Sequence, residues 1–350
     1  MSEATRLSSH FATGANTMAT RRPRVAVIGT GGTFAMQARH RFDWIEYGDS
    51  GVVLPIDTLL DQLGALDLPV EITPVPFRAL GSTAITPQDW SELAALVART
   101  ARTDPTLDGI IVTHGTATLE ETAWFLDLTL TLDMPVVLTG AQRPANTEGS
   151  DASGNLRAAL ASAASAHTRG LGVLVVMDGR IFAARDVTKA ASFELAAFEA
   201  PLAGPLGHVD ANGEVHVRRI PRHAARPFAI DAERLAPLPR VDVTMSYAGA
   251  DGVAIEALVA AGARGLVSAG VPPGRPAKGE AAALANAARR GVVVVQASRA
   301  VRGTVPEQAF LRAAGVLAGG ELPPHKLRVL LMLALAYSDD KTLIQQWIMG

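Results

Sequence analysis

The sequence contains no cysteine among its 350 residues. Disulfides, thiolate catalysis and cysteine-based metal sites are therefore excluded. The formal charges nearly cancel, leaving a net charge of -2, so the charge balance gives no reason to expect nucleic acid or an anionic membrane as a partner. No apolar run approaches the ~18 residues of a membrane span, and the longest, residues 329–336, predicts a short buried helix. Residues 1–24 lack the continuous apolar core of a secretion signal. We therefore expect a disordered lead over residues 1–23 and a cytoplasmic protein.

Apolar runs of strand length alternate with helix-length amphipathic stretches along the chain. Continuous apolar strands with helices between them are typical of a parallel sheet covered on both faces. Residues 220–239 interrupt this pattern with four prolines and many charges, as a linker would. We predict a two-domain α/β protein: a larger N-terminal parallel-sheet domain (24–220), a linker (221–239) and a smaller C-terminal flavodoxin-like α/β domain (240–350). Strands are expected over residues 25–29, 109–113, 135–139, 172–177, 241–246, 265–269 and 292–297, and helices over residues 119–130, 155–164, 254–261 and 279–290.

Polar residues should gather where strands end, because open parallel sheets bind ligands outside the carboxyl ends of their strands. The first strand ends in Gly-Thr-Gly-Gly-Thr at residues 29–33. A dinucleotide-binding turn would need glycine where Phe34 stands, and a helix next. Residues 37–51 are instead polar and broken by glycines, which predicts a mobile lid. Glycines such as Gly32 let a substrate approach closely and leave the hydroxyl of Thr33 exposed.

The second strand is followed by His-Gly-Thr-Ala-Thr at residues 114–118. Thr118, with Glu121 three positions later, predicts a capping box at the start of the next helix. Thr116 is not needed for capping and is freer to act in function. His114 alone is more often a structural residue than a catalytic one. No second histidine or carboxylate lies at metal-ligand spacing from it, so no metal site is expected.

Lys189 stands out because lysine is rare in this chain, at four positions among 32 basic residues. Arginine keeps its proton in proteins, whereas a desolvated lysine can lose it. The only lysine in the first 277 residues therefore suits proton transfer. The alternative is an ordinary surface lysine.

Several ordered motifs together resemble those of the bacterial L-asparaginase family, from about Val25 to the C-terminus. Each motif is weak alone, but their order over some 250 residues is specific. The motifs are Gly-Gly-Thr at residues 31–33, Thr-His-Gly-Thr-Ala-Thr-Leu-Glu-Glu-Thr-Ala at 113–123, Gly-Ala-Gln-Arg-Pro at 140–144, Ser-Asp-Ala-Ser-Gly-Asn-Leu at 150–156, Ala-Arg-Asp-Val-Thr-Lys at 184–189 and Val-Ser-Ala-Gly at 267–270.

The resemblance implies a role for each matching position. Thr33 would be the nucleophile that forms an acyl-enzyme, and Tyr47 in the lid would help to activate it. Thr116 and Lys189 would form a proton relay. Ser82 would hold the substrate carboxylate, and the carbonyl of Ala141 the leaving amide. A threonine hydroxyl is a poor nucleophile until a base removes its proton, which a lysine or tyrosine of lowered pKa can do.

The sequence departs from the family at positions that read the amino end of the substrate. Ala117 stands where the family has an aspartate that holds the α-ammonium of asparagine, and Thr83 replaces a glutamine. Gly249 replaces an asparagine of the small domain. The acidic residue that a neighbouring subunit donates has no secure match, and Glu307 lies nearby at altered spacing. These departures predict weak use of L-asparagine.

The resemblance therefore implies an amidohydrolase that acts on a small-molecule amide as a homodimer or homotetramer. No cofactor, metal, nucleic acid or membrane is expected. Its substrate would be L-asparagine or an amide without a free α-amine. A binding protein that has lost its activity, a dinucleotide-dependent enzyme and a tRNA-dependent amidotransferase subunit are the alternatives. The last is disfavoured because it carries an extra domain before the glycine-rich turn.

Overall fold

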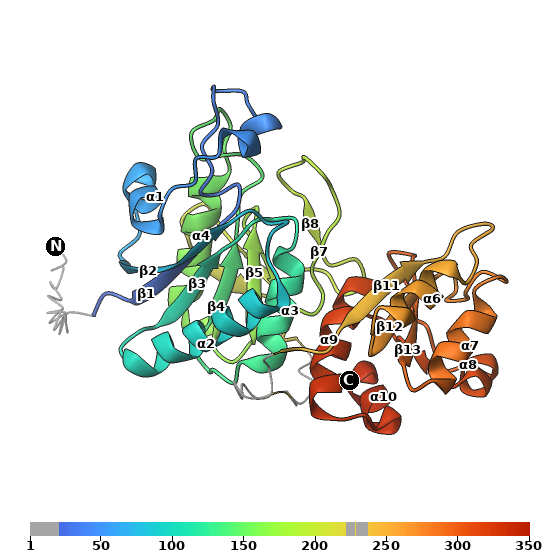
Figure 1. Ribbon diagram of the computed structural model, residues 1–350. Coiled ribbons are helices and arrows are strands. Elements are labelled where there is room, and N and C mark those ends of the chain that lie inside the picture. The colour runs from blue at the N-terminus through green and yellow to red at the C-terminus, as the bar shows by residue number, and fades with distance from the viewer. Residues whose placement is uncertain (1–20, 222–227, 229–236) are drawn as a thin grey trace, which may run out of the picture.

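The computed structural model describes residues 21–221, 228 and 237–350. Two sheets organise these residues (Figure 1). The larger sheet has eight strands in the order β10-β9-β6-β5-β4-β3-β1-β2, and the smaller has four in the order β11-β12-β13-β14. A separate two-stranded ribbon pairs β7 with β8. These arrangements confirm an α/β fold with a larger N-terminal and a smaller C-terminal sheet.

Strands β2-β1-β3-β4-β5 of the larger sheet are parallel, whereas β6, β9 and β10 join its edge in antiparallel pairs, so this sheet is mixed. All four strands of the smaller sheet are parallel. The strands are β1 Arg24–Gly31, β2 Glu71–Leu80, β3 Gly109–Thr113, β4 Val136–Thr139, β5 Val173–Met177, β6 Arg180–Ala183, β7 Thr188–Lys189, β8 Phe198–Glu199, β9 Gly207–Val209, β10 Val215–Val217, β11 Val241–Met245, β12 Gly265–Gly270, β13 Val293–Ser298 and β14 Leu317–Ala318.

Helices cover both faces of the larger sheet, as its continuous apolar strands predict. In β1, Ala26 and Ile28 pack toward α2 and α3, and the alternate residues Val25 and Val27 pack toward α1 and α4. The helices are η1 Glu46–Ser50, α1 Ile56–Leu63, α2 Pro87–Thr103, α3 Leu119–Thr129, α4 Ala152–Ala164, η2 Ala166–Thr168, α6 Val253–Ala260, α7 Ala281–Arg289, α8 Ala309–Ala314, α9 Pro324–Tyr337 and α10 Lys341–Met349.

Helix α9 lies between the two sheets and contacts both α3 and β12 (Figure 1). Its apolar run over residues 329–336 is a buried helix, as predicted, and no helix among the described residues is long and apolar enough to span a membrane. One hydrophobic cluster runs from the α2–α3 face of the larger sheet through α9 to Val267 and Val295 of the smaller sheet. The two domains are therefore packed through a common core.

Two predicted segments fall mainly outside the described residues. The lead over residues 1–23 is described only at residues 21–23, and the linker over residues 221–239 only at its ends and at Phe228. Phe228 is fully buried, and its ring packs edge-on against Tyr337 and Trp347. This ring ties the connection to α9 and α10.

The predicted capping box at Thr118 is wrong. The Thr118 side chain makes no cap hydrogen bond, and its hydroxyl donates instead to the carbonyl of Ser82 at 2.7 Å. Glu121 lies 3.8 Å from Arg328 of α9. Both side chains therefore have long-range partners that compete with local capping.

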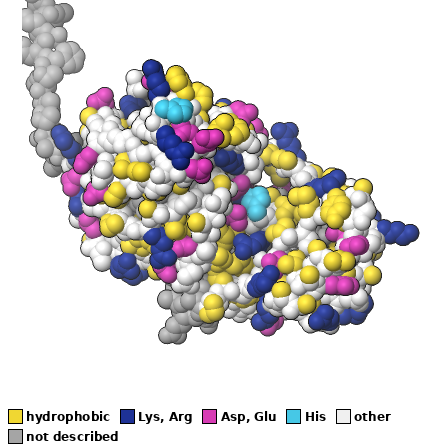
Figure 2. Space-filling model, turned by 45° about the horizontal axis from the view of Figure 1, so that its top comes forward, with side chains coloured by type: hydrophobic (Ala, Val, Ile, Leu, Met, Phe, Trp, Pro, Cys, Tyr) yellow, Lys and Arg dark blue, Asp and Glu magenta, His cyan; other side chains and the backbone are white. Residues whose placement is uncertain are grey.

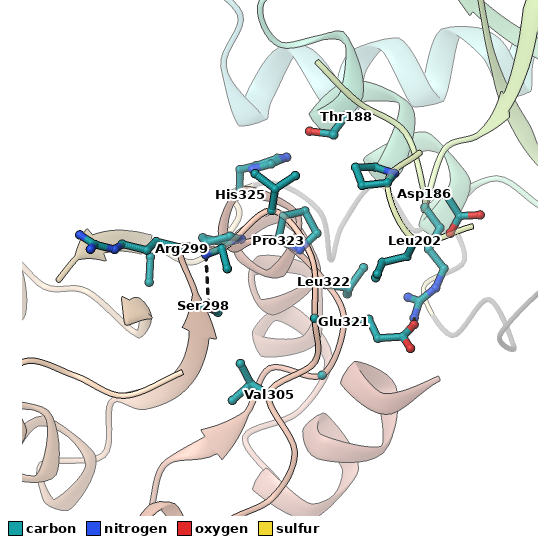
Figure 3. Close-up of a pocket in the computed structure, with 18 of the residues that line it drawn as sticks. Asp186, Thr188, Leu202, Ser298, Arg299, Val305, Glu321, Leu322, Pro323 and His325 are labelled. Atoms are coloured by element: carbon teal, nitrogen blue, oxygen red, sulfur yellow. Dashed lines mark hydrogen bonds and ion pairs between the residues drawn. The ribbon is translucent and has the colours of Figure 1, made fainter. Parts of the chain in front are cut away.

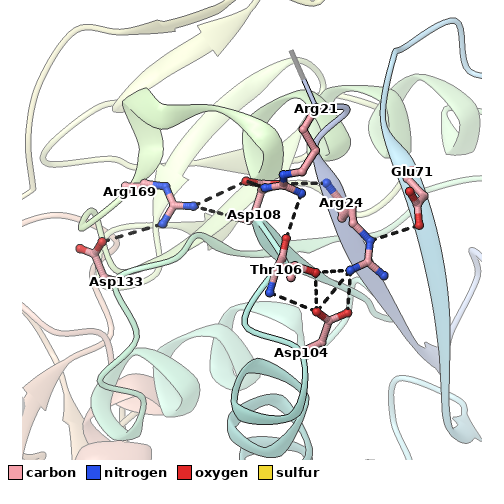
Figure 4. A network of polar contacts seen from close by, with 8 residues as sticks. All are labelled: Arg21, Arg24, Glu71, Asp104, Thr106, Asp108, Asp133 and Arg169. Atoms are coloured by element: carbon pink, nitrogen blue, oxygen red, sulfur yellow. Dashed lines mark hydrogen bonds and ion pairs between the residues drawn. The ribbon is translucent and has the colours of Figure 1, made fainter. Parts of the chain in front are cut away.

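Charged side chains fasten the amino ends of the strands, at the edge of the larger sheet opposite its glycine-rich turn (Figure 4). Arg24, at the start of β1, bonds to Glu71 at the start of β2 at 3.1 Å and to Asp104 at 3.0 Å. Asp108, just before β3, accepts from the Arg24 backbone N–H at 2.8 Å. The charged residues at the amino ends of the strands are therefore paired with one another and have a structural role. The candidate site is expected at the carboxyl ends.

Candidate active site

Two turns meet at the carboxyl edge of the larger sheet. Strands β1 and β3 are parallel neighbours with Gly29 opposite Thr113, so the residues that follow them leave the sheet side by side. A Cβ on Gly32 would lie 2.3 Å from the Cα of Gly115, and the backbone of Gly32 has a φ of +73°. Only glycine permits this approach and this conformation. The close contact brings the next residues, Thr33 and Thr116, together.

Thr33 and Tyr47 form the first hydroxyl pair. The Thr33 Oγ1 lies 2.7 Å from the Tyr47 hydroxyl, and Thr33 is 7% exposed. Tyr47 lies in η1, within the segment 37–51 that the sequence predicts to be a lid. The structure therefore brings together the predicted nucleophile, which lies in the turn after β1, and the predicted tyrosine, which lies in η1.

The segment that carries Tyr47, which we call the lid (residues 37–51), is attached to the large domain through polar contacts. The Asn146 side chain exchanges two hydrogen bonds with the backbone of Ala38, each of 2.9 Å. Arg143 stacks over the Trp44 ring at 3.9 Å. Asp43, buried at the centre of the lid, accepts from the Glu46 backbone N–H at 2.9 Å. The lid is thus a folded loop with Tyr47 directed at Thr33, and its predicted mobility stays a prediction.

Thr116 and Lys189 form a second pair, in which a threonine hydroxyl contacts an amine. We call the Thr33–Tyr47 and Thr116–Lys189 contacts the two hydroxyl pairs. The Lys189 Nζ donates to the Thr116 Oγ1 at 2.7 Å, and Thr116 is 5% exposed. Burial lowers the pKa of Lys189 below its ordinary value, against the opposing charges of Glu120 and Asp151. A lysine with a lowered pKa exchanges its proton more readily near neutral pH. Lys189 therefore has both the contact and the environment of a proton-transfer group.

The predicted substrate-binding residues surround these pairs. A Cβ on Gly115 would lie 2.2 Å from the Cβ of Ser82, so the Ser82 turn touches the same backbone. Ala141 is fully buried, and Asp151 accepts from the next N–H, that of Gln142, at 3.0 Å. Thr83 and Ala117 are exposed. The structure thus places Ser82 in the cluster and leaves the two altered positions open to solvent.

His114 is a buried structural residue, as the sequence indicates. It is 1% exposed, and its Nδ1 and Nε2 lie 2.8 Å from the Gly115 carbonyl and 2.9 Å from the Thr122 hydroxyl. Burial lowers its pKa to about 4, although the Gly115 carbonyl favours the protonated ring. His114 is therefore neutral at physiological pH and supports the turn that carries Thr116.

Comparison with known proteins agrees with this arrangement. A family model for the N-terminal domain of asparaginase matches residues 24–223, and one for the glutaminase/asparaginase C-terminal domain matches residues 240–348. A probable periplasmic L-asparaginase of Haemophilus influenzae is 36% identical over 93% of this chain and 92% of its own length. L-asparaginase 2 of Escherichia coli is also 36% identical, over the same two shares. The crystal structure of a probable cytoplasmic L-asparaginase from Campylobacter jejuni superposes with a TM-score of 0.86 at 32% identity, covering 94% of this chain and all of that one.

The chain belongs to the bacterial L-asparaginase family. The relatives named L-asparaginases are amidohydrolases, so this member is an amidohydrolase too. The dinucleotide alternative fails, because a turn and the lid, not a helix, follow Gly32.

A crevice of about 600 Å³ separates the two domains of this asparaginase-family chain (Figure 3). Asp186, Thr188 and Leu202 line its large-domain side, and Ser298 and Val305 lie on the small-domain side. Hydrophobic side chains lie on both sides of the hollow between the domains (Figure 2). Because Thr188 precedes Lys189 directly, the crevice reaches the segment that carries the lysine.

The two small-domain residues that the sequence analysis singled out, Gly249 and Glu307, are distant in sequence from the two hydroxyl pairs. Gly249 has a φ of +87°, in a turn where the N–H of Ala250 returns to the carbonyl of Tyr247. Glu307 lies 3.8 Å from Arg312 and lines a different cavity with Lys341 and Gln345. Delivery of Glu307 to a neighbouring subunit stays a prediction.

Among the described residues, one group of three ionisable side chains lies close enough to hold a metal ion: Asp210, Glu214 and His216. The Asp210 Oδ1 already accepts the backbone N–H groups of Asn212 and Glu214 at 2.9 Å each, and its Oδ2 lies 3.3 Å from the His216 Nε2. These bonds close the turn between β9 and β10. The group therefore has a structural explanation without a metal.

Proposed function

We propose that this chain hydrolyses a side-chain amide to the acid and ammonia through an acyl-enzyme on Thr33, with L-asparagine as the default substrate. The observation that carries the proposal is the pairing of Thr33 with Tyr47 at 2.7 Å beside the pairing of Thr116 with Lys189 at 2.7 Å. Thr33 and Thr116 stand on adjoining glycine-rich turns. The hydroxyl of each contacts a group, Tyr47 or Lys189, that can accept its proton. This arrangement provides a nucleophile and a second path for protons.

In the first half-reaction, the Thr33 Oγ1 attacks the amide carbon while Tyr47, acting as its phenolate, accepts the Thr33 proton. The new C–O bond converts the carbonyl to an oxyanion, and the C–N bond then breaks. The leaving nitrogen takes a proton and departs as ammonia, which leaves an ester on Thr33. In the second half, water loses a proton to the same relay and attacks the ester, the ester C–O bond breaks to release the acid, and the Thr33 Oγ1 takes back a proton. Lys189, through Thr116, supplies and recovers the protons.

Backbone N–H groups would stabilise the oxyanion. Within the described part of the chain, the N–H groups of Thr33 and Thr116 have no hydrogen-bond acceptor. Both belong to the turns that meet at Gly32 and Gly115. A donor of this kind contributes ~3 kcal/mol to the transition state of acyl transfer. The pair supports amide hydrolysis over simple amide binding.

The substrate is predicted to lack a free α-ammonium, or to carry it with a penalty. Ala117 supplies a methyl group where the family resemblance implies a carboxylate, and Gly249 and Thr83 remove further polar contacts. An ammonium buried without its partner costs ~3–5 kcal/mol. We therefore expect a high KM for L-asparagine and better relative use of amides with hydrogen or an acylated nitrogen at that position.

A coupled ammonia-release assay tests this function across L-asparagine, L-glutamine and deaminated or N-acylated analogues of asparagine. Release from any of them that Thr33→Ala abolishes supports the proposal. A micromolar KM for L-asparagine would overturn the specificity argument and leave the assignment of Thr33 standing. Binding of these ligands by calorimetry without any ammonia release would instead favour the alternative of a non-catalytic binder, which Ala117 suggests.

The predicted assembly is a homodimer, or a tetramer built from two dimers. Exposed apolar side chains gather at the crevice between the domains, among them Leu202, Met245 and Val301. An isologous contact with a second copy would bury them, and closed symmetry favours even assemblies. Light scattering checks this, and a monomer with full specific activity would rule it out. The cytoplasmic location also stays a prediction, since relatives named as periplasmic and as cytoplasmic both match.

A further inference from the structure

The segment that carries Lys189 is held by a second lysine from the other domain. Lys326, in the first turn of α9, is fully buried. Its Nζ donates to the carbonyls of Ala184 at 2.7 Å and Arg185 at 3.0 Å, and also to that of Val187. An ammonium has three donors, and all three carbonyls belong to the short connection between β6 and Lys189. The contact therefore fixes this connection at three points.

The charge of Lys326 is satisfied mainly by backbone carbonyls. Burial lowers its pKa to about 8, while the charges of Glu120 and Asp186 oppose that effect. The ammonium therefore remains mostly protonated at neutral pH. A buried cation is costly unless it is fully hydrogen-bonded. Movement of residues 184–187 away from α9 would leave the ammonium without these acceptors, so the three contacts resist that movement.

Glu120 holds the other side of the same segment. Its Oε1 accepts the backbone N–H of Lys189 at 3.2 Å, and its Oε2 lies 3.0 Å from the His325 Nε2. Burial alone would raise the pKa of Glu120, but the hydrogen bond and charge of His325 hold it below its ordinary value. Glu120 is therefore ionised. It lies in the first turn of α3, four residues after Thr116.

We propose that Lys326 and the Glu120–His325 pair are positioning residues that hold the Lys189 ammonium on the Thr116 hydroxyl. His325 and Lys326 are adjacent in the first turn of α9. This helix start of the small domain therefore fixes residues 184–187, which lead to Lys189, and also Glu120, which accepts the Lys189 backbone N–H. Asp186, Thr188 and His325 lie around the crevice where the two domains face each other (Figure 3). The small domain thus sets the geometry of a proton relay in the large domain. The catalytic consequence rests on the proposed function; the positioning itself does not.

The experiment compares four full-length variants. Lys326→Met removes the three donors and keeps the length of the side chain. His325→Ala removes the partner of Glu120, and His325→Gln restores a donor to it. Lys341→Met is the matched control, because the Nζ of this partly exposed lysine makes one long hydrogen bond within the described part of the chain, 3.4 Å to the Gly315 carbonyl, far from Lys189 in the chain. Each variant is checked by circular dichroism before kcat and KM are measured.

We expect kcat to fall about tenfold or more in Lys326→Met and less in His325→Ala, with KM changed by less than about threefold, since displacement of a relay group slows the chemical step. His325→Gln should recover most of the loss, and Lys341→Met should match the wild type. Unchanged kcat in folded Lys326→Met and in His325→Ala would overturn the proposal. If Lys326→Met does not fold, the comparison of the two His325 variants decides the question.

A second readout does not depend on activity. With four lysines in the chain, a protein labelled with ¹³Cε-lysine gives few lysine signals, and Lys189→Met, Lys278→Met, Lys326→Met and Lys341→Met each assign one of them. The Lys189 signal should move in Lys326→Met and His325→Ala, and its titration midpoint should rise. Release from burial favours the charged form of Lys189, and so does a Glu120 carboxylate that has lost a cationic neighbour. Asp151 acts in the same direction in every variant. A Lys189 signal identical in all variants would refute positioning. Absence of ammonia release by the wild type would refute only the proposed function.

Discussion

The two hydroxyl pairs rest on supports of different kinds. Tyr47 comes from the lid, where η1 has no buried residue and the ion pair between Arg41 and Glu148 is exposed. Lys189 comes from a segment fixed by a fully buried lysine and a buried carboxylate. Segments with few buried contacts open at low free-energy cost, whereas buried polar networks are rigid. The comparison suggests that one half of the site opens to admit substrate while the other half stays fixed.

The largest effect on activity should come from Thr33, the proposed nucleophile on which both hydroxyl pairs act. Thr33→Ala removes the nucleophile and should lower ammonia release by at least about a thousandfold, because no acyl-enzyme can form. Circular dichroism should be unchanged, since among the residues that the structure describes the Thr33 hydroxyl bonds to Tyr47 of the lid and to no other side chain. Thr58→Ala, at an exposed position of α1, is the matched control and should retain full activity. Retention of more than a few per cent of activity in Thr33→Ala would sink the assignment.

Removal of the hydroxyl from the lid pair should have the next largest effect. Tyr47→Phe keeps the ring and loses the proton acceptor, so kcat should fall about a hundredfold, within the range of general-base contributions. Tyr337→Phe serves as the control, since its ring packs against Phe228 at the far end of α9. A kcat within twofold of wild type in Tyr47→Phe would show that Lys189 alone activates Thr33.

The same comparison predicts that protease attacks the two halves differently. Cleavage within residues 37–51 should slow when an inhibitor is bound, because closure places Tyr47 on Thr33 and excludes water. Cleavage within residues 184–189 should be slow with and without it. Equal protease sensitivity of the lid in both conditions would mean that it is a fixed surface loop.

Much of this site could be predicted from local sequence. The strands β1, β3, β4 and β5 are continuous apolar runs, and the glycine-rich turn after β1 singles out Thr33. Strand β2 escaped prediction because Pro74 and Pro76 interrupt it, which is tolerated at the edge of a sheet where it lies. Helix α2 went unpredicted although Thr86 and Asp89 form a capping box around Pro87.

The support for Lys189 could not be predicted in the same way. Glu120 and His325 are 205 residues apart in the sequence, and Lys326 and Ala184 are 142 apart. No periodicity or local motif joins positions so distant, because only the packing of α3 against α9 brings them together. One signal was present. The scarcity of lysine that marks Lys189 marks Lys326 equally, just before the apolar run of its helix.

A smaller effect is expected at the exposed rim of the site. Ala117→Asp adds a carboxylate where an α-ammonium would lie. Because residue 117 is exposed, solvent weakens the pairing, so the ratio of kcat/KM for L-asparagine over a deaminated analogue should shift by about tenfold toward asparagine. Ala84→Asp, on an exposed position of the neighbouring turn, controls for added charge alone. An unchanged ratio in Ala117→Asp would mean that another carboxylate, such as Glu307 of a neighbouring subunit, already pairs with the ammonium.

The smallest effect on activity should come from His114, which supports the fixed half without entering the chemistry. Its pKa is about 4 in the folded chain, against an ordinary value of 6.5. The unfolded chain therefore binds the proton more tightly, so the contribution of neutral His114 to stability is complete above pH 6.5 and is lost as the pH falls toward 4. A shift of this size corresponds to about 3 kcal/mol. Urea denaturation at fixed protein concentration should show a shallower fall in stability between pH 6.5 and 4 for His114→Gln than for wild type.

Exposed His208 provides the control for that measurement. His208→Gln makes the same replacement in β9, at a position outside the candidate site. At pH 7, His114→Gln should retain kcat within a few-fold, since the Thr116–Lys189 contact is made by other residues. Equal pH dependence in wild type and His114→Gln would show that the His114 pKa does not change on folding, and would contradict the assignment of a neutral ring with a lowered pKa.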